Sequence, residues 1–271
     1  MIRDIEYPDL LFFESLKSKE DILHFSTTRN GGVSVGNFKS LNLGNYSDDD
    51  PLNIYENRSI VARKFHINVE NLITPHQTHS NNVITIDEEF LKLDKATQID
   101  KLYGFDASIT NLKGLFLCVT TADCVPILLY DPLNKAIGAI HAGWKGTSGR
   151  IIEYTINSMI ETYNTSPFNL IACIGPSISI TNYEVGNDVK KIFEENNFNL
   201  NDSNSFISNE SGKIHIDLKE INRQELIRLG VKEDNIEKTR FCTYQREDLF
   251  FSARRQTIRS GRMLTGIQIR K

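Results

Sequence analysis

The sequence predicts a mixed-sheet α/β sandwich that folds as one domain over residues 1–271. Three observations predict this fold class. Apolar runs of strand length outnumber the segments with helical spacing, and two of these runs flank a tight turn, as in an antiparallel hairpin. The length of 271 residues is close to the upper limit for one hydrophobic core, which favours a single large domain. The hairpin argues for a mixed sheet rather than a doubly wound parallel one.

The composition is that of a globular protein. Hydrophobic residues make up 39% and charged residues 24% of the chain, which excludes a disordered or fibrous class. The net charge of −4 lacks the basic surplus of a general nucleic-acid binder, although a local basic patch is still allowed. The apolar runs are too short to span a membrane, and the first six residues include two acidic ones, Asp4 and Glu6, where a signal peptide would be basic and then apolar. We therefore expect a cytoplasmic protein that binds neither nucleic acid nor membrane.

Two segments are predicted as long loops. Residues 30–50 are rich in Gly, Ser and Asn and show little helical periodicity. Long loops inside compact domains are often functional, so this segment is of interest for a binding site. Residues 196–211 contain six Asn and four Ser, which predicts a mobile surface loop.

The middle of the chain carries three predicted strands. Leu115–Thr120 and Val125–Tyr130 are apolar runs of strand length, and Ala136–Ile140 is the third. The sequence Asp-Pro-Leu-Asn at 131–134 is a turn signal between the last two. These two strands therefore form the hairpin, and the start of one lies beside the end of the other.

The second half of the chain mixes helices and strands. Apolar positions from Ile151 to Ile160 have helical spacing, and Thr147 or Ser148 is the expected N-cap. A helix ended by Gly230 is also predicted. The other expected elements are strands at 170–174, 241–242 and 263–269 and helices at 188–195 and 218–229.

Most of the histidines and cysteines have ordinary structural explanations. Among the six histidines, His24 lies at a strand start, His66 follows a helix-like stretch, and His215 lies on the polar face of a predicted strand. We expect each to be a surface or a satisfied core side chain. The four cysteines contain no CxxC pair, which predicts free thiols rather than disulfides.

The remaining histidines and one cysteine have neighbours that suggest a site. His76 and His79 lie three residues apart beside a proline, in a loop that we expect to be rigid. Cys124 separates two apolar strands, and His141 ends the third strand, where glycines let a ligand approach the backbone. The hairpin places Cys124 and His141 on the same rim of the sheet.

Two imidazoles and one thiolate suit a zinc ion, with bonds of about 2.0–2.3 Å. Three protein ligands leave a fourth position for water or substrate, as in catalytic zinc sites. The spacing of His79, Cys124 and His141 matches no short zinc motif, so the residues alone leave separate core and surface roles open. They also leave open a nucleophilic Cys124 with His141 as its base. Asp123 would disfavour a low-pKa thiolate at its neighbour unless its carboxylate points away.

An arginine cluster suggests an anion site. Arg254 and Arg255 follow two phenylalanines, so this segment offers a stacking wall and a bidentate clamp for phosphate. Arg29 precedes Asn-Gly-Gly, whose exposed backbone amides also suit an anion. The motif of a phosphate-binding Walker loop is absent. We predict that Arg29, Arg254 and Arg255 bind phosphate.

Segments along nearly the whole chain together resemble the YfiH-like family, also called DUF152 or the laccase-domain (polyphenol-oxidase) proteins. The segments that carry the resemblance are 26–34, 40–44, 76–79 (His-Gln-Thr-His), 121–126 (Thr-Ala-Asp-Cys-Val-Pro), 141–147 (His-Ala-Gly-Trp-Lys-Gly-Thr), 173–176, 183–185, 251–255 and 261–263. Their order and number make the match specific.

The resemblance implies a single α/β sandwich similar to Cys/His hydrolase-like folds. It implies a zinc ion held by His79, Cys124 and His141, with copper as the other metal that it allows. Members are described as purine nucleoside phosphorylases with adenosine deaminase and methylthioadenosine phosphorylase activity, and some bacterial members as editing factors for peptidoglycan precursors. The family often has a cysteine where this chain has Ser177, so a redox role at that position is not expected.

We therefore predict a zinc-dependent purine nucleoside phosphorylase acting on adenosine, inosine and methylthioadenosine, with adenosine deamination as a further activity. Its catalytic residues would be Cys124, His141 and His76, and its partners a purine nucleoside and phosphate, in a monomer or homodimer. Two alternatives stay open: a Cys/His amidase that edits peptidoglycan precursors, and a non-catalytic structural zinc module. A multicopper oxidase is disfavoured, because it needs about ten histidines.

Overall fold

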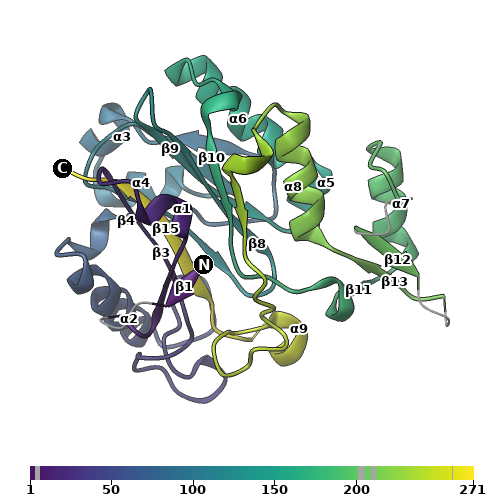
Figure 1. Cartoon of the computed structure of the whole chain (residues 1–271). Helices are drawn as coiled ribbons and strands as arrows, with labels where there is room; N and C mark the ends of the chain where they lie inside the picture. The colour runs from purple at the N-terminus through teal and green to yellow at the C-terminus, as the bar shows by residue number, and fades with distance from the viewer. Residues whose placement is uncertain (4–6, 201–204, 209–211, 258) are drawn as a thin grey trace.

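Two six-stranded mixed sheets form the centre of the protein (Figure 1). The computed structural model describes residues 1–3, 7–200, 205–208, 212–257 and 259–271. The first sheet has the order β1 (Ile2–Arg3), β2 (Leu10–Phe12), β3 (Ile22–Thr27), β15 (Met263–Ile269), β7 (Phe116–Thr121), β4 (Leu72–Ile73). The second has the order β14 (Ile236–Lys238), β10 (Ile171–Ile174), β8 (Val125–Asp131), β9 (Ala136–Ala142), β6 (Ala107–Thr110), β5 (Val83–Thr85). Both combine antiparallel and parallel pairs.

A third, three-stranded antiparallel sheet lies outside the two large sheets, at the right of Figure 1. Its order is β11 (Glu184–Val185), β13 (Ile214–Ile216), β12 (Phe206–Ser208). The α-helices are α1 (Glu14–Lys17), α2 (Pro51–Lys64), α3 (Glu88–Lys92), α4 (Lys95–Lys101), α5 (Trp144–Ser148), α6 (Ile151–Tyr163), α7 (Asn187–Glu195), α8 (Leu218–Arg228) and α9 (Ala253–Gln256). Short 3-10 turns occupy 36–38, 69–71, 167–169, 180–182 and 233–235.

The two large sheets pack face to face around a shared core. Leu117 and Val119 of the first sheet pack in one buried cluster with Leu128, Ile137 and Cys173 of the second. This arrangement confirms the predicted mixed-sheet α/β sandwich. The extent of the domain, residues 1–271, stays a prediction, and the core that the two sheets share is the observation in its favour.

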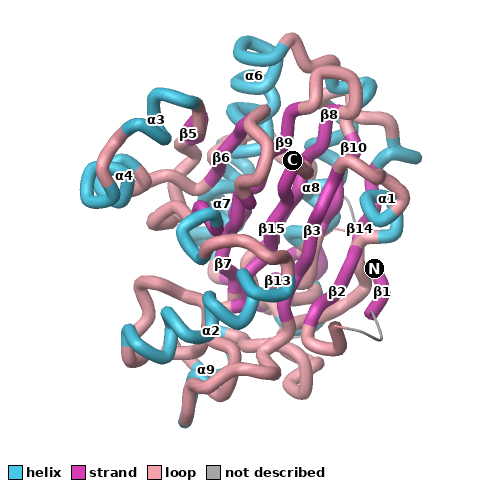
Figure 2. The backbone as a smooth tube through the Cα atoms, turned by 90° about the vertical axis from the view of Figure 1, so that its left-hand side faces the viewer, coloured by secondary structure: helices cyan, strands magenta, loops and turns pink. Residues whose placement is uncertain are grey.

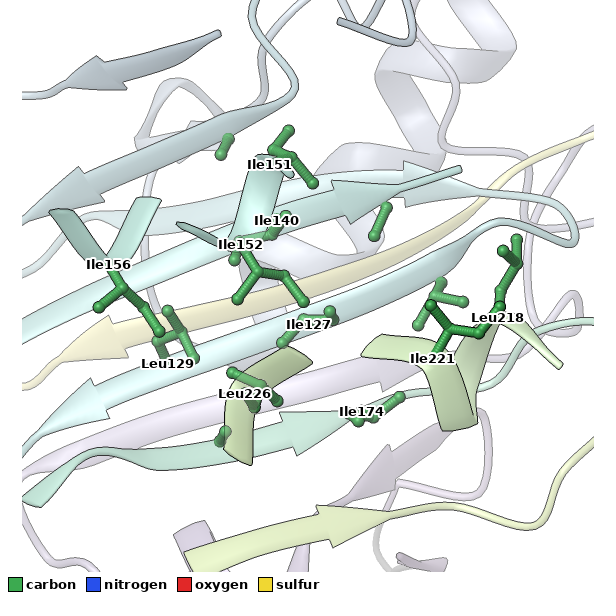
Figure 3. Close-up of a cluster of buried hydrophobic side chains, with 14 of the residues drawn as sticks. Ile127, Leu129, Ile140, Ile151, Ile152, Ile156, Ile174, Leu218, Ile221 and Leu226 are labelled. Carbon is green, nitrogen blue, oxygen red and sulfur yellow. The ribbon is translucent and has the colours of Figure 1, made fainter. Parts of the chain in front are cut away.

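Helices cover the outer face of each sheet. Val61 and Ala62 of α2 pack against Phe25 and Phe116 of the first sheet. On the other side, α6 and α8 lay their isoleucines and leucines on β8, β9 and β10 (Figure 3). This packing buries the apolar face whose spacing predicts the helix at 151–160. The layers therefore run helix, sheet, sheet, helix.

The predicted hairpin is present. The strands β8 and β9 pair antiparallel, with Val125 opposite Ala142 and Pro126 opposite His141. Asp131 accepts hydrogen bonds from the backbone N–H groups of Leu133 and Asn134, which closes the turn. The open end of the hairpin lies at the rim that carries the predicted site.

One helix start differs from the prediction. Thr147 and Ser148 do not cap the helix over 151–163; they belong to the separate helix α5. Arg150 precedes α6 in the left-handed conformation, with φ of 64°, and separates the two helices. The predicted cap was wrong because Arg150 carries contacts that hold this conformation, among them a 2.6 Å ion pair with Glu225.

Two further predictions were wrong in part. The segment 241–242 is not a strand, because Cys242 forms only an isolated bridge with Ser177. The predicted loop at 196–211 contains the strand Phe206–Ser208, whose Phe206 is buried, while residues 201–204 and 209–211 lie outside the described residues. The helix end at Gly230 and the long loop at 30–50 are confirmed. No helix in the described part of the chain has the length and apolar character needed to cross a membrane.

The last strand occupies the middle of the first sheet. In Figure 2, β2, β3, β15 and β7 lie side by side in that order. Thr265 pairs with Ser26 on one side and with Val119 on the other. The C-terminal strand therefore joins β3 to β7, whose paired residues Ser26 and Val119 lie 93 residues apart in the sequence.

Candidate metal centre

The three predicted metal ligands converge at the open end of the hairpin. Cys124 directly precedes β8, His141 lies on β9 opposite Pro126, and His79 comes from the loop between β4 and β5. One ligand atom from each of the three residues lies within 4.8 Å of the other two. Among the described residues, this is the one group of His, Cys, Asp or Glu side chains that could hold a metal ion.

A buried carboxylate ties two of these residues together. Asp106, whose side chain has no exposed surface, accepts hydrogen bonds from the backbone N–H groups of Thr78, His79 and Ser80 at 2.8–3.1 Å. It also accepts one from Nδ1 of His141 at 2.6 Å. Asp106 thus fixes the loop that carries one imidazole and the ring of the other. Because Nδ1 is occupied, the Nε2 atom of His141 is the one left for a metal.

The electrostatics favour a thiolate beside an imidazolium when no metal is bound. Burial alone would raise the pKa of the Cys124 thiol, but the imidazoles of His141 and His79 outweigh it and lower this pKa to about 6. Burial alone would lower the pKa of His141, but the Cys124 thiolate and the Asp106 carboxylate raise it to about 9. A negative thiolate and nitrogen donors are what zinc binds.

The neighbouring carboxylate points away from the thiol. Asp123 has a positive φ of 90°, and its side chain accepts hydrogen bonds from the hydroxyls of Thr243 and Ser252. It also accepts one from the backbone N–H of Arg254. The obstacle that the sequence raised against a low pKa at Cys124 is therefore removed.

The donor set fits a tetrahedral ion of zinc size. Bonds of about 2.0–2.3 Å place tetrahedral ligand atoms about 3.3–3.8 Å apart. Sγ of Cys124 and Nε2 of His79 lie 3.9 Å apart. Gly143 keeps this space open, because a Cβ there would lie 3.0 Å from Cδ2 of His79 and 3.1 Å from Sγ of Cys124.

A cavity of about 400 Å³ opens beside the cluster. This volume is in the range of small-molecule sites. Its walls come from the loop after Leu43, the loop that carries His76, the end of β7, and the hairpin rim. The lining residues are Gly44, Asn45, Tyr46, Ser47, Asp48, Thr74, Pro75, His76, Gln77, His79, Thr120, Thr121, Ala122, Cys124, His141, Ala253 and Arg262.

His76 lies in this cavity without joining the ligand cluster. Its ring stacks on Tyr46, with centroids 3.6 Å apart, and Tyr103 meets its edge. Its neighbour Gln77 exchanges hydrogen bonds with the backbone of Thr120, which fixes the loop to β7. The predicted catalytic role of His76 stays a prediction, and its position beside the metal site is compatible with it.

The three predicted phosphate ligands do not line the cavity. Arg29 donates to the backbone carbonyls of Lys39 and Glu247 and lies over the ring of Phe251. Arg255 donates to three backbone carbonyls in the segment 243–250. Both guanidinium groups thus hold the loops of the rim together, and their contact with phosphate stays a prediction.

The third predicted ligand, Arg254, is exposed, donates to the carbonyl of Glu184 and lies over the ring of Tyr183. A further arginine, Arg262, lines the cavity itself and donates from Nη1 to the carbonyls of Ser260 and Gly261. Burial lowers the pKa of Arg262, and the Cys124 thiolate acts in the opposite direction. Gly44 makes room for Arg262, since a Cβ there would lie 2.8 Å from its Cγ.

Sequence reasoning missed Asp106 and passed over Arg262. The one available signal for Asp106 was a charged residue directly before a strand, Ala107–Thr110. Arg262 entered the sequence analysis only within the segment 261–263 that carries the family resemblance. Their roles depend on segments far apart in the chain, so no local pattern distinguishes them.

Comparisons with known proteins agree with this architecture. Residues 23–270 match the model of the multi-copper polyphenol oxidoreductase laccase family. A purine nucleoside phosphorylase of Bacteroides thetaiotaomicron is 43% identical, with 97% of each chain covered. An adenosine deaminase, RL5, of an unknown prokaryotic organism is 40% identical, over 93% of this chain and 95% of that protein.

A solved structure shows the same fold. The YfiH protein of Bacillus licheniformis superimposes with a TM-score of 0.90 at 31% identity, and 98% of each chain is covered. The family match covers the whole second sheet, most of the first sheet and all three clustered ligands. This chain therefore belongs to the multi-copper polyphenol oxidoreductase laccase family.

Proposed function

We propose that this chain is a zinc-dependent purine nucleoside phosphorylase acting on adenosine, inosine and methylthioadenosine, with adenosine deamination as a further activity of the same site. The observation that carries the proposal is the His79–Cys124–His141 cluster at the wall of a cavity of about 400 Å³. Two relatives, 43% and 40% identical, are named a purine nucleoside phosphorylase and an adenosine deaminase, which supports the substrate class.

The cluster favours a catalytic over a structural zinc site. Three side chains offer ligand atoms within the described residues, and the cavity reaches all three. A structural zinc site would be closed by a fourth protein ligand. One three-ligand group also provides no basis for the several copper ions that the family name mentions, and the nitrogen and thiolate donors suit zinc.

Phosphorolysis joins a phosphate oxygen to C1′ of the ribose while the bond from C1′ to N9 of the purine breaks. The electron pair of that bond leaves with the purine, which must be protonated or hydrogen-bonded as it departs. A bound zinc ion would supply Lewis acidity and a water of lowered pKa at this place. In deamination, water would instead replace the amine at C6 of adenine.

The residues of this chain would bind and orient the two substrates. Asp106 holds His141 and His79 in position, and His76, stacked on Tyr46, adds an imidazole to the cavity lining. Arg262 is the arginine that lines the cavity, so we place the phosphate next to it. The competing version of the phosphate site is the one predicted from the sequence, formed by Arg29, Arg254 and Arg255.

Metal analysis tests the first half of the proposal. We expect one zinc per chain after mild purification, and its loss in Cys124→Ala and in His141→Ala. Circular dichroism of each variant shows whether the fold is retained. Full zinc content in both folded variants would refute the site.

Steady-state kinetics test the second half. Adenosine and inosine cleavage is measured with phosphate varied, for wild type and for Arg262→Lys, Arg29→Lys and Arg254→Ala. We expect Arg262→Lys to raise the KM for phosphate about tenfold while the nucleoside KM changes less, because lysine keeps the charge but loses the paired donors that only phosphate would use. A larger effect in Arg29→Lys or Arg254→Ala would favour the competing version. Base release that does not depend on phosphate would exclude phosphorolysis.

A Cys/His amidase is the second candidate, and one observation favours it. Nδ1 of His141 donates a hydrogen bond to Asp106. The same imidazole interacts with the Cys124 thiolate, which raises the pKa of His141. The order Asp106, His141, Cys124 is that of an acid–base–nucleophile triad. His79 has no role in such a triad. Cleavage of a muramyl peptide by the metal-free protein, with no nucleoside turnover, would decide for the amidase.

A further inference from the structure

A second cavity, of about 380 Å³, lies in a groove between α2 and α4. The helix α2 contributes Pro51, Ile54, Tyr55 and Arg58, and α4 contributes Lys95, Gln98, Ile99 and Leu102 at its end. Both sets follow the spacing i, i+3, i+4, i+7, so each helix turns one face into the groove. Leu72, Ile73 and Thr74, at β4, form the floor.

A buried guanidinium without a counter-charge lines this groove. Arg58 is 7% exposed and donates to the carbonyl of Leu72 at 2.7 Å and to the hydroxyl of Thr74 at 3.1 Å. A third, longer bond of 3.5 Å reaches the carbonyl of Leu43. These partners are neutral, and no described carboxylate lies within 4.0 Å of Arg58. Burying a charge without an opposite charge is costly, so this position suits an anionic ligand.

The other groove residues add a second cation and flat apolar walls. Lys95 is exposed and bonds to the neutral Oε1 of Gln98. Glu70 is the acidic side chain in the lining, and it is exposed to solvent. Tyr55 and Ile99 are each 58% exposed, although both are large apolar side chains that line the groove. Two cations beside exposed aromatic and aliphatic surface suit a ligand in which a flat ring carries a dianionic group.

We propose that the groove between α2 and α4 is a second ligand site, which binds the phosphate monoester of an aromatic base, such as a nucleoside monophosphate. Its phosphate would lie between Arg58 and Lys95, where a guanidinium offers paired donors to phosphate oxygens. Its base would lie on Tyr55 and Ile99. Free phosphate lacks the apolar contact and a nucleoside lacks the charge, so both would bind more weakly.

The groove adjoins the cavity of the metal centre, and Asn45, Tyr46 and Thr74 line both. Tyr46 lines both cavities and stacks on His76 in the first. Tyr46 is therefore shared between the groove and the stack that supports His76. The proposal does not depend on the reaction at the metal centre, because binding alone tests it.

Calorimetry on the zinc-loaded protein with AMP, adenosine and inorganic phosphate as probes tests the proposal. AMP should bind at least tenfold more tightly than either of the other two. Ile99→Glu places a negative charge at the groove without removing a buried side chain, and it should weaken AMP binding at least tenfold. Ile99→Gln, its uncharged match, should change the Kd less than about threefold.

Two further variants separate the groove from general effects. Leu52→Glu adds the same charge on α2 at a residue that is 77% exposed and outside the groove, and it should leave AMP binding unchanged. Arg58→Lys keeps a positive charge but loses the paired donors, so AMP should bind more weakly while the melting temperature reports any loss of fold. AMP affinity that is equal in wild type, Ile99→Glu and Arg58→Lys, or no AMP binding at millimolar concentration, would overturn the proposal.

Discussion

At the scale of single residues, Asp106 decides the geometry of the metal centre. It accepts hydrogen bonds from the loop of His79 and from the ring of His141, which come from segments about sixty residues apart. A carboxylate behind a metal-binding imidazole fixes the ring and its tautomer. The position of two of the three ligands therefore depends on a residue that contacts no substrate.

Asp106→Asn should lower the affinity for zinc by about 10–100-fold, because the amide offers one acceptor fewer and presents N–H groups to donors. Zinc affinity is measured by competition with a chelator of known affinity. Asp131→Asn is the matched control: Asp131 is equally buried, but it accepts hydrogen bonds at the turn of the β8–β9 hairpin, at the end away from the cluster. Equal zinc affinities in the two variants would remove Asp106 from its positioning role.

The state of Cys124 gives a prediction about pH. Burial acts to raise the pKa of this thiol, but the neighbouring imidazoles have a larger, opposite effect and lower the pKa to about 6. Because the thiolate is the reactive form, alkylation of the zinc-free protein should increase as pH rises through about 6 rather than through about 8.5. Iodoacetamide labelling followed by mass spectrometry measures this profile. Labelling should vanish in Cys124→Ser and after zinc is added, and a midpoint near 8.5 would contradict the ion pair.

At the scale of elements, the outer helices are held to the second sheet by one apolar face. Ile152 of α6 is 1% exposed and packs in the cluster with Ile127 and Ile140, whereas Tyr154 on the same helix is 52% exposed. Burying an isoleucine stabilises the fold by about 1.5–3 kcal/mol. The apolar spacing of this helix was visible in the sequence because it reflects that face.

Ile152→Ala should therefore lower the free energy of unfolding by about 2–5 kcal/mol, which includes the cavity that it leaves. Tyr154→Ala should change it by less than about 0.5 kcal/mol, since this side chain lies on the solvent face. Urea denaturation followed by circular dichroism measures both. Similar losses in the two variants would show that α6 does not pack as described.

At the scale of the whole molecule, the C-terminal strand closes the first sheet. All residues of β15 are buried, and the strand pairs with β3 near the start of the chain and with β7 in its middle. Removing it would expose the edges of both neighbouring strands and the core between the sheets. The first sheet therefore cannot form until the C-terminal strand is in place between β3 and β7.

Deletion of residues 263–271 should abolish cooperative unfolding and zinc binding together, because the metal-site residues depend on both sheets. Deletion of Lys271 alone is the control, since this residue lies beyond the strand. Differential scanning calorimetry and metal analysis provide the measurements. A truncated protein that still melts cooperatively and holds zinc would show that the second sheet folds without the first.

The sequence by itself determined the elements whose patterns are local. The hairpin, the strand Met263–Ile269 and the helix after Gly149 follow from apolar runs and turn residues a few positions apart. The hairpin register alone was enough to bring Cys124 to the same rim as His141. The addition of His79 to this pair rested on residue type and on the family resemblance.

Only the tertiary structure decided the contacts made across the chain. Arg262 lines the cavity because Asn42 and Gly44, more than two hundred residues away, hold its backbone and leave space for its stem. All three arginines donate to backbone carbonyls, Arg262 to those of Ser260 and Gly261, but Arg29 and Arg255 do so away from the cavity. A guanidinium binds whichever acceptors the fold brings to it, and a sequence pattern does not contain that information. Local periodicity therefore predicted the elements, whereas the packing of distant loops selected the residues of the site.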